Sequence, residues 1–356
     1  MPASHMPWPA SGRLAQDAFP ASKRQRTIPQ EIVVPRDMTS VIQSALGSPP
    51  PLDQRILTWN IDGLDNTGEA HGLMLRTLAA AQVIARLRPF AILLQEVISP
   101  ALELISAPQV LGSVYEVVEP DNVKTSYWVA ILIDKKKLRR VGNPITVAFP
   151  SSVMDRHLLI VFVEFAMSRG DREQCDHEVA LQGRVMALAT AHLESTQRYS
   201  FERSRQLQHC FRYLSSLVDQ TPPGNTSTSC LVSSVVFGGD LNLRDSEAID
   251  VRTQLGGDFC GFQDAWEVCG CPEESRWTWD STTNTNIKSG FVCRARFDRL
   301  FYLVARGNDG TPNAVASNYI GLKPIAVKLV GKCRAFDLGR FPSDHWGVLT
   351  SWVARK

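Results

Sequence analysis

A series of short apolar runs, rich in β-branched residues, recurs along the chain and is the feature that most constrains its fold. Each run has the length and composition typical of a buried strand. Few segments between them have helical spacing, which favours two packed sheets flanked by helices over one doubly wound sheet. The expected strands are 55–60, 90–97, 127–134, 157–166, 184–193, 231–243, 295–304 and 347–354, and the expected helices are 73–89 and 201–218.

Composition leaves the class of partner open. The chain has 356 residues, of which 44% are hydrophobic and 21% are charged, as in ordinary globular proteins. Its net charge of +2 creates no global field that would select nucleic acid, so any DNA contact must come from a local cluster. No apolar run is long enough to span a membrane, and we expect no membrane partner.

The cysteines are scattered, and we expect reduced thiols in an intracellular protein. Cys269 and Cys271 lie close to Cys260, but no histidine is near them in the sequence, so a zinc site is not expected there.

The first fifty residues are rich in Pro, Ser and Ala and show little periodicity. We therefore expect a disordered tail over residues 1–50 and a single folded domain over residues 51–356. The basic run 23–26 ("KRQR") fits a nuclear-import patch and predicts a nuclear location, with the cytoplasm as a second one. The scarcity of acidic residues before Glu31 leaves a mitochondrial transit peptide open.

Polar residues stand where several of the expected strands end. Taken singly, each fits a turn or a satisfied structural position. Taken together, they offer carboxylates, carboxamides and a histidine without any Cys/His cluster, which favours Mg²⁺ or Mn²⁺ over zinc and suits phosphoryl chemistry. The residues are Asn60 and Asp62, Gln95 and Glu96, His192, and Asp240 and Asn242.

Six blocks of the chain resemble, in order, the endonuclease/exonuclease/phosphatase superfamily, and within it the tyrosyl-DNA phosphodiesterases. They are "TWNIDGLD", "LLQEV", "TAHLEST", "GGDLNLRD", "RFDRLFY" and "RFPSDHWG", and the similarity covers about residues 55 to 353. The resemblance implies a four-layer α/β sandwich, with two mixed sheets packed face to face and helices outside. It makes residues 51–356 the catalytic domain.

The resemblance also implies roles for individual residues. Glu96 is the main metal ligand, with Asp62 and Asp344 near the metal. The implied catalytic residues are Asn60, Glu96, Asp240, Asn242, Asp298 and His345. Asp240 would activate the attacking water with help from Asn242, and His345, fixed by Asp298, would bind the scissile phosphate. The implied substrate-binding residues are Tyr127, Arg156, His192, Ser195, Arg244 and Trp279.

The activity that the resemblance implies is hydrolysis of the bond between a DNA 5′ phosphate and a tyrosine of a trapped type II topoisomerase. Mg²⁺ is the implied cofactor, with Mn²⁺ as an alternative, and the implied partners are DNA and a topoisomerase-derived peptide bound by a monomer. An abasic-site endonuclease, a phosphoinositide phosphatase and an inactive DNA-binding module remain alternatives. The first two would share the catalytic blocks, and the third would be expected to lose a ligand.

Overall fold

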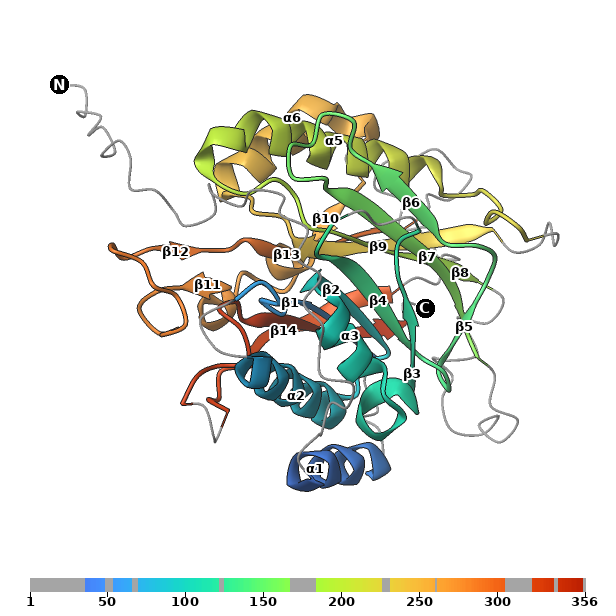
Figure 1. Cartoon of the computed structure of the whole chain (residues 1–356). Coiled ribbons are helices and arrows are strands. Elements are labelled where there is room, and N and C mark those ends of the chain that lie inside the picture. The colour runs from blue at the N-terminus through green and yellow to red at the C-terminus, as the bar shows by residue number, and fades with distance from the viewer. Residues whose placement is uncertain are drawn as a thin grey trace. The chain divides into compact units, whose positions relative to one another are not determined.

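The strands of the computed structural model form two large mixed sheets (Figure 1). The structure describes residues 36–48, 54–65, 70–121, 125–166, 184–225, 231–259, 261–304, 322–335 and 339–354. All of these residues belong to one compact unit that spans residues 34–356. The expected four-layer α/β sandwich is confirmed, because the two sheets pack face to face and helices cover their outer faces.

The first sheet has the order β14-β15-β1-β2-β4-β3. Its strands are β1 (Gln54–Asn60), β2 (Ala91–Val97), β3 (Tyr115–Val118), β4 (Trp128–Asp134), β14 (Leu322–Val330) and β15 (Gly347–Ala354). β1 and β2 run parallel, whereas the other neighbours are antiparallel.

The second sheet has the order β10-β13-β9-β8-β7-β5, and β6 also pairs with β7. Its strands are β5 (Leu138–Arg140), β6 (Ile145–Ala148), β7 (His157–Phe165), β8 (Val185–Ala191), β9 (Val232–Asp240), β10 (Gln263–Asp264) and β13 (Asp298–Val304). Here β8 and β9 form the parallel pair. A small hairpin of β11 (Trp279–Asp280) and β12 (Arg294–Ala295) lies outside both sheets.

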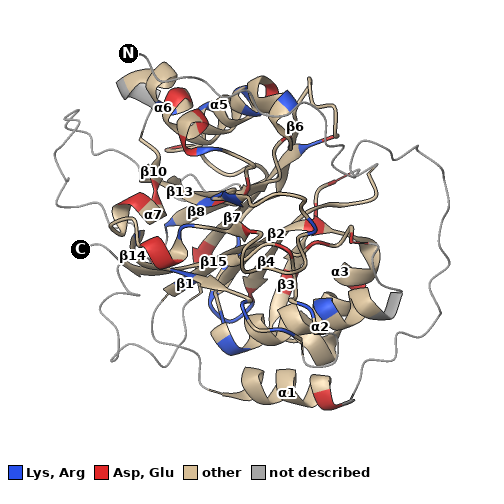
Figure 2. Cartoon of the chain, turned by 90° about the vertical axis from the view of Figure 1, so that its left-hand side faces the viewer, with Lys and Arg blue, Asp and Glu red and all other residues tan. Residues whose placement is uncertain are grey.

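One hydrophobic core lies between the sheets and a second lies under the helices of the second sheet. Ile56, Leu93 and Ile131 of the first sheet meet Leu188 and Val236 of the second in the first core. In the second core, α5 (Ser200–Ser216) and α6 (Asp245–Phe259) pack on β7, β8 and β9. These two helices carry both signs of charge (Figure 2).

The first sheet is covered by α2 (Ala70–Leu87) and α3 (Ser99–Ser106), and the π-helical turn η1 (Pro108–Gly112) follows α3. The remaining short elements are η3 (Gln197–Tyr199), α7 (Ala265–Val268) and η4 (Glu273–Ser275). α2 ends just before Pro89, and Arg88 has a left-handed backbone with φ 48°. A proline disfavours the helical conformation of the residue before it, so the expected helix stop is confirmed. No described helix is long and apolar enough to cross a membrane.

The prediction of a disordered tail over residues 1–50 is wrong for α1 (Arg36–Gly47). Ile42 is fully buried, and Gln43 Nε2 donates to the carbonyl of Gln109 in η1. Arg88 Nη1 donates to the carbonyl of Leu46 near the end of the helix. A short helix like this one is stabilised by docking rather than by propensity, so periodicity did not reveal it. Residues 1–35, including the basic run 23–26, lie outside the described residues.

Candidate active site

The polar residues at the strand ends gather at one end of the sandwich. Asn60 ends β1, and Glu96 lies near the end of the parallel strand β2. Asp240 ends β9, and His192 directly follows the parallel strand β8. Parallel neighbours finish at the same sheet edge, so each sheet brings its own pair of side chains to the site.

Asn60 joins the two sheets at the centre of the site. Its Nδ2 donates to Glu96 Oε1 at 3.1 Å and to Asp240 Oδ2 at 3.0 Å. Its Oδ1 accepts from the backbone N–H of Asp62 at 2.9 Å. Because the side-chain oxygen faces a fixed backbone donor, the side-chain NH2 group must face the two carboxylates.

Left-handed backbone recurs among the site residues. The φ angles are 51° at Asp62, 53° at Glu96 and 51° at Asn242. Non-glycine residues rarely adopt this conformation, and such strain concentrates at functional sites.

A β-bulge in β2 turns Glu96 toward the site. Leu94 pairs with Ala130, but Val97 pairs with Trp128, so Gln95 and Glu96 together oppose one residue of β4. Such a bulge re-aims a side chain. It leaves Gln95 buried between the sheets, where its Nε2 donates to Thr58 Oγ1 at 3.1 Å and to Thr190 Oγ1 at 3.0 Å.

The carboxylates of the site are crowded in a buried environment. Burial and the charge of Asp344 raise the pKa of Glu96 to about 7, although Asn60 opposes the shift. Burial, with Asp298 nearby, raises the pKa of Asp240 despite the charge of His345. A bound cation would relieve this repulsion, so the donor set fits a hard divalent metal.

His345 is held as a cation among carboxylates. Its Nδ1 lies 2.8 Å from Asp298 Oδ2, and its Nε2 lies 3.6 Å from Asp240 Oδ2 and 4.0 Å from Asp344 Oδ1. Burial alone would lower the pKa of His345, but the three carboxylates raise it well above its usual value. Asp298 stands directly opposite Asp240 in the β13–β9 pairing, which fixes the spacing of the pair.

The loop that carries His345 is fixed by its own neighbours. Trp59 Nε1 donates to the carbonyl of His345 at 3.0 Å. Ser343 Oγ donates to the carbonyl of Asn60 at 2.6 Å and accepts from the N–H of His345 at 3.0 Å. The imidazole is therefore placed by backbone contacts to β1 as well as by its carboxylate partners.

His192 is neutral, unlike His345. Burial, together with the charges of Arg156 and His345, lowers the pKa of His192 well below its usual value. Arg156 Nη1 donates to His192 Nδ1 at 2.9 Å, and His192 Nε2 lies 3.4 Å from Asp240 Oδ2. An arginine only donates, so the imidazole proton must be on Nε2. The Arg156 guanidinium also lies 5.1 Å from the ring centre of Tyr127, so these three predicted residues meet.

The other predicted substrate residues occupy different positions. Ser195 Oγ lies 3.4 Å from Met154 Sδ, close to Arg156. Arg244 has an exposed side chain just beyond Asn242, at the start of α6. Asn242 itself is anchored, because its N–H donates to Asp240 Oδ1 at 3.1 Å.

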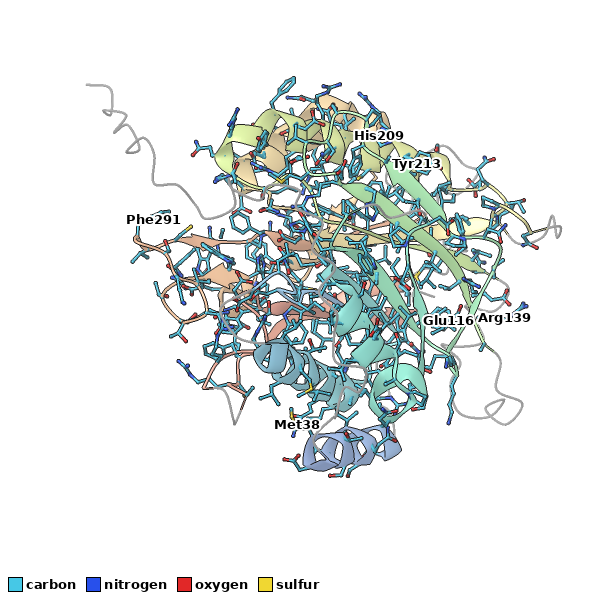
Figure 3. All side chains as sticks on the ribbon, in the orientation of Figure 1. Met38, Glu116, Arg139, His209, Tyr213 and Phe291 are labelled. Atoms are coloured by element: carbon cyan, nitrogen blue, oxygen red, sulfur yellow. The ribbon has the colours of Figure 1, made fainter. Side chains whose placement is uncertain are left out.

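Trp279 stands at the base of the β11–β12 hairpin and is half-buried. Its Nε1 donates to Asp344 Oδ2 at 3.3 Å, and its ring lies 6.0 Å from that of Phe297. The hairpin extends outward to Phe291, which is 55% exposed (Figure 3). Trp279 therefore combines a partly open ring with a direct contact to a predicted metal-site residue.

Two groups of described residues bring potential metal-binding atoms within 4.8 Å of one another. They are Glu96, His192 and Asp240, and Asp240, Asp298 and His345. Neither group contains Asp62 or Asp344, although both were predicted near the metal. Asp62 instead accepts from Arg76 Nη1 at 3.2 Å, while Asp344 accepts from Trp279. Both nevertheless lie close enough to Glu96 for their charges to interact.

Some supporting residues were missed from the sequence. Arg76 is buried in α2 and contacts Asp62 and the carbonyl of Pro342, so it ties two site loops together. Glu194 is also fully buried, and in the sequence it stands only within the block "TAHLEST". The available signal for Arg76 was an arginine between Leu75 and Thr77, inside an otherwise apolar stretch of the expected helix 73–89, because a buried charge needs partners.

The chain is similar to curated proteins named tyrosyl-DNA phosphodiesterase 2. It is 35% identical to that of Gallus gallus over 294 residues, which cover 83% of this chain and 65% of the relative. It is 32% identical to that of Rattus norvegicus over 314 residues, which cover 87% of this chain and 70% of the relative. The chain thus spans less than two thirds of the length of the Gallus gallus protein. No family model matches the chain.

A solved structure agrees with these similarities. The crystal structure of D. rerio TDP2 complexed with single strand DNA product aligns with a TM-score of 0.66 at 28% identity, covering 85% of this chain and 99% of that one. Sequence similarity over most of the chain and the shared fold lead to one conclusion. The chain belongs to the tyrosyl-DNA phosphodiesterase 2 family.

Proposed function

We propose that the chain is a Mg²⁺-dependent phosphodiesterase that hydrolyses the bond between a DNA 5′ phosphate and a tyrosine. The observation that carries the proposal is the joining of Glu96 and Asp240 through Asn60, with the cationic His345 beside them. The names of the relatives and the single-strand DNA product bound to the D. rerio protein support the choice of substrate.

The residues present fit a divalent metal. Glu96 would hold it, with Asp62, Asp344 and Asp240 close by, because the neighbouring carboxylates repel one another. Hard oxygen donors favour Mg²⁺, and Mn²⁺ accepts the same donors. Such an ion, when bound, polarises a phosphoryl oxygen and offsets the charge that develops on it.

The protein groups account for the remaining tasks. Asp240 carries a carboxylate that can accept a proton from the attacking water. His345, kept cationic by Asp298, can donate a hydrogen bond to a phosphate oxygen. The leaving phenol has a pKa of about 10, so it departs without strong acid assistance. Positioning water and stabilising phosphate charge are thus the main requirements.

A rate assay on three substrates tests this function. Hydrolysis of a 5′-phosphotyrosyl oligonucleotide, an abasic duplex and a phosphoinositide would be followed over a Mg²⁺ titration. Turnover of the first substrate alone is expected. Preference for the abasic duplex or the phosphoinositide would select that activity, and DNA binding without turnover would indicate a binding module.

Glu96→Gln should lower turnover of the tyrosyl substrate by two orders of magnitude or more, as for loss of one key electrostatic group. Glu116→Gln is the matched control, because Glu116 lies on the edge strand β3 and pairs with Arg140 at 3.4 Å. Figure 3 labels Glu116 away from the strand ends that form the site. Near-normal turnover of Glu96→Gln at ordinary Mg²⁺ would remove Glu96 from the primary site.

We further propose that the substrate in cells is a topoisomerase II-derived peptide on a DNA 5′ end, acted on by a monomer in the nucleus during break repair. The basic run 23–26 supports nuclear import. Replacing its basic residues with alanine and imaging the tagged protein tests this location, and unchanged nuclear enrichment would reject that signal.

A further inference from the structure

Glu194 is a fully buried carboxylate two residues beyond His192. Its Oε1 accepts hydrogen bonds from Ser152 Oγ at 2.6 Å, the N–H of Val153 at 2.9 Å and the N–H of Met154 at 3.2 Å. It also accepts from Gln206 Nε2 at 3.4 Å. The carboxylate thus binds the loop between β6 and β7, far from it in sequence, through backbone N–H groups.

The backbone around Glu194 has contacts of its own to α5. The carbonyls of Glu194 and Thr196 each accept from Arg203 Nη1 at 2.8 Å. The N–H of Glu194 donates to Gln206 Oε1 at 3.0 Å. Since α5 already holds the backbone after β8, the consequence of the Glu194 side chain lies in the other loop.

A chain of contacts leads from that loop to the site. Ser152 Oγ, which donates to Glu194, accepts from the N–H of Arg156 at 2.8 Å. Arg156 in turn donates to His192 Nδ1 at 2.9 Å, and His192 Nε2 lies 3.4 Å from Asp240 Oδ2. From Glu194 to His192 the series starts and ends on the segment after β8, and it passes through Arg156, the donor that fixes the imidazole tautomer.

We propose that Glu194 is a positioning residue: by anchoring residues 152–154 it places Arg156 on His192, which keeps the imidazole proton on Nε2, facing Asp240. The inference rests on the proposed function for its effect on rate, but the tautomer itself can be measured without substrate. Asp240 would lose a fixed neighbouring donor if His192 changed tautomer or moved.

Two substitutions separate positioning from a general need for the charge. Glu194→Ala should lower kcat/KM on the tyrosyl substrate by roughly ten- to hundredfold, because small misplacements have effects of this size. Glu194→Gln should stay within about threefold of the wild type, since it keeps Oε1, and Oε2 accepts no hydrogen bond from any described residue. Similar losses in both variants would overturn the proposal.

Glu202→Ala is the matched control. Glu202 Oε1 also accepts from a serine of the same loop, Ser151 Oγ at 2.7 Å, but it has no link to Ser152 or Arg156. Its rate should match the wild type. An equal loss in Glu202→Ala would show that any tie to this loop suffices and would overturn the specific role of Glu194.

Nitrogen NMR of the histidine rings is the deciding measurement. The chain has 7 histidines, and the His192 signals can be assigned by their loss in His192→Gln. The wild type and Glu194→Gln should show His192 protonated on Nε2, whereas Glu194→Ala should show mixed tautomers. If Glu194→Ala fails to fold, Ser152→Ala takes its place. This variant breaks the contact from Glu194 to the N–H of Arg156 but keeps the N–H contacts of Val153 and Met154, and it should also show mixed tautomers.

An unchanged Nε2 tautomer in the folded Glu194→Ala or Ser152→Ala protein would overturn the proposal. Failure of the proposed function is distinguishable from this outcome, because it would leave the tautomer result intact and remove only the rate effects. Combining Glu194→Ala with Arg156→Ala gives a further check, since two residues acting through one another should show non-additive losses.

Discussion

Glu96 combines a left-handed backbone, a bulged strand and a pKa raised to about 7 through burial and the charge of Asp344. Each feature costs stability in the metal-free protein, and the bulge and the left-handed backbone aim the side chain into a crowded site. Asn60 offsets part of the cost by donating to the carboxylate. This placement at a cost in stability is what the proposed role of Glu96 in cation binding requires.

Glu96→Gln should stabilise the metal-free protein at high pH. The pKa of Glu96 is raised from 4.5 to about 7, so the folded state keeps a proton that the unfolded state releases within this window. The free energy of unfolding of the wild type therefore falls as pH rises from about 4.5 to about 7, by about 3 kcal/mol in total. Urea unfolding with EDTA at pH 5 and pH 8 should show the variant gaining on the wild type, and a constant gap would contradict the shift.

The role of Trp279 can be divided between its ring and its N–H. Trp279→Phe keeps a ring and removes only the donor to Asp344, so its kcat/KM on DNA should fall by only a few-fold. Trp279→Ala also removes a surface on which a base can stack, so its kcat/KM on DNA should fall roughly tenfold further than that of Trp279→Phe. A small aryl phosphodiester should be affected similarly by both variants. Equal losses of kcat/KM on DNA in the two variants would rule out the stacking role.

At the scale of elements, α1 extends the folded domain beyond the expected boundary at residue 51. It lies against α2 and η1 on the outer layer of the first sheet, remote from the strand ends that carry the site (Figure 1). We therefore expect α1 to contribute stability without a direct contribution to turnover.

Ile42→Ala should lower the free energy of unfolding by about 2–4 kcal/mol, because the side chain is fully buried. Val41→Ala is the matched control, since Val41 is 39% exposed on the same helix. Turnover of a short tyrosyl oligonucleotide should be unchanged in both variants, and also after deletion of residues 1–50, although the deletion should lower the melting temperature. An unaltered melting temperature in Ile42→Ala would show that the docking is weak.

At the scale of the whole molecule, the sandwich assembles one site from two sheets. β1 and β2 deliver Asn60 and Glu96, while β9 and β13 deliver Asp240 and Asp298. Gln95 ties the sheets together just below the site through Thr58 and Thr190. Binding of a cation between the two sheets should therefore stabilise the entire fold.

Mg²⁺ at a hundred times its dissociation constant should raise the free energy of unfolding by about 2.7 kcal/mol, if it binds only the folded state. Glu96→Gln should lose most of this gain, whereas Glu116→Gln should keep it. Chemical denaturation with and without Mg²⁺ measures the difference, with Ca²⁺ and added salt as controls for charge screening. An equal gain in wild type and Glu96→Gln would place the stabilising ion elsewhere.

Local pattern predicted the donor set of the candidate site and much of the architecture. Apolar runs gave the principal strands, and the stop at Pro89 gave the end of α2, because both depend on neighbouring residues alone. The ordered polar blocks pointed to Asn60, Glu96, Asp240 and His345, and the fold brings these residues together.

Only the tertiary structure decided what depends on contacts distant in sequence. α1 is helical because Ile42 and Gln43 dock on other elements, and the short strands β10, β11 and β12 exist only through their partners. Burial and the charge of Arg156 lower the pKa of His192, whereas Asp298 and two further carboxylates raise the pKa of the equally buried His345. Protonation and tautomer are set by neighbours in space, so no local pattern in the chain encodes them.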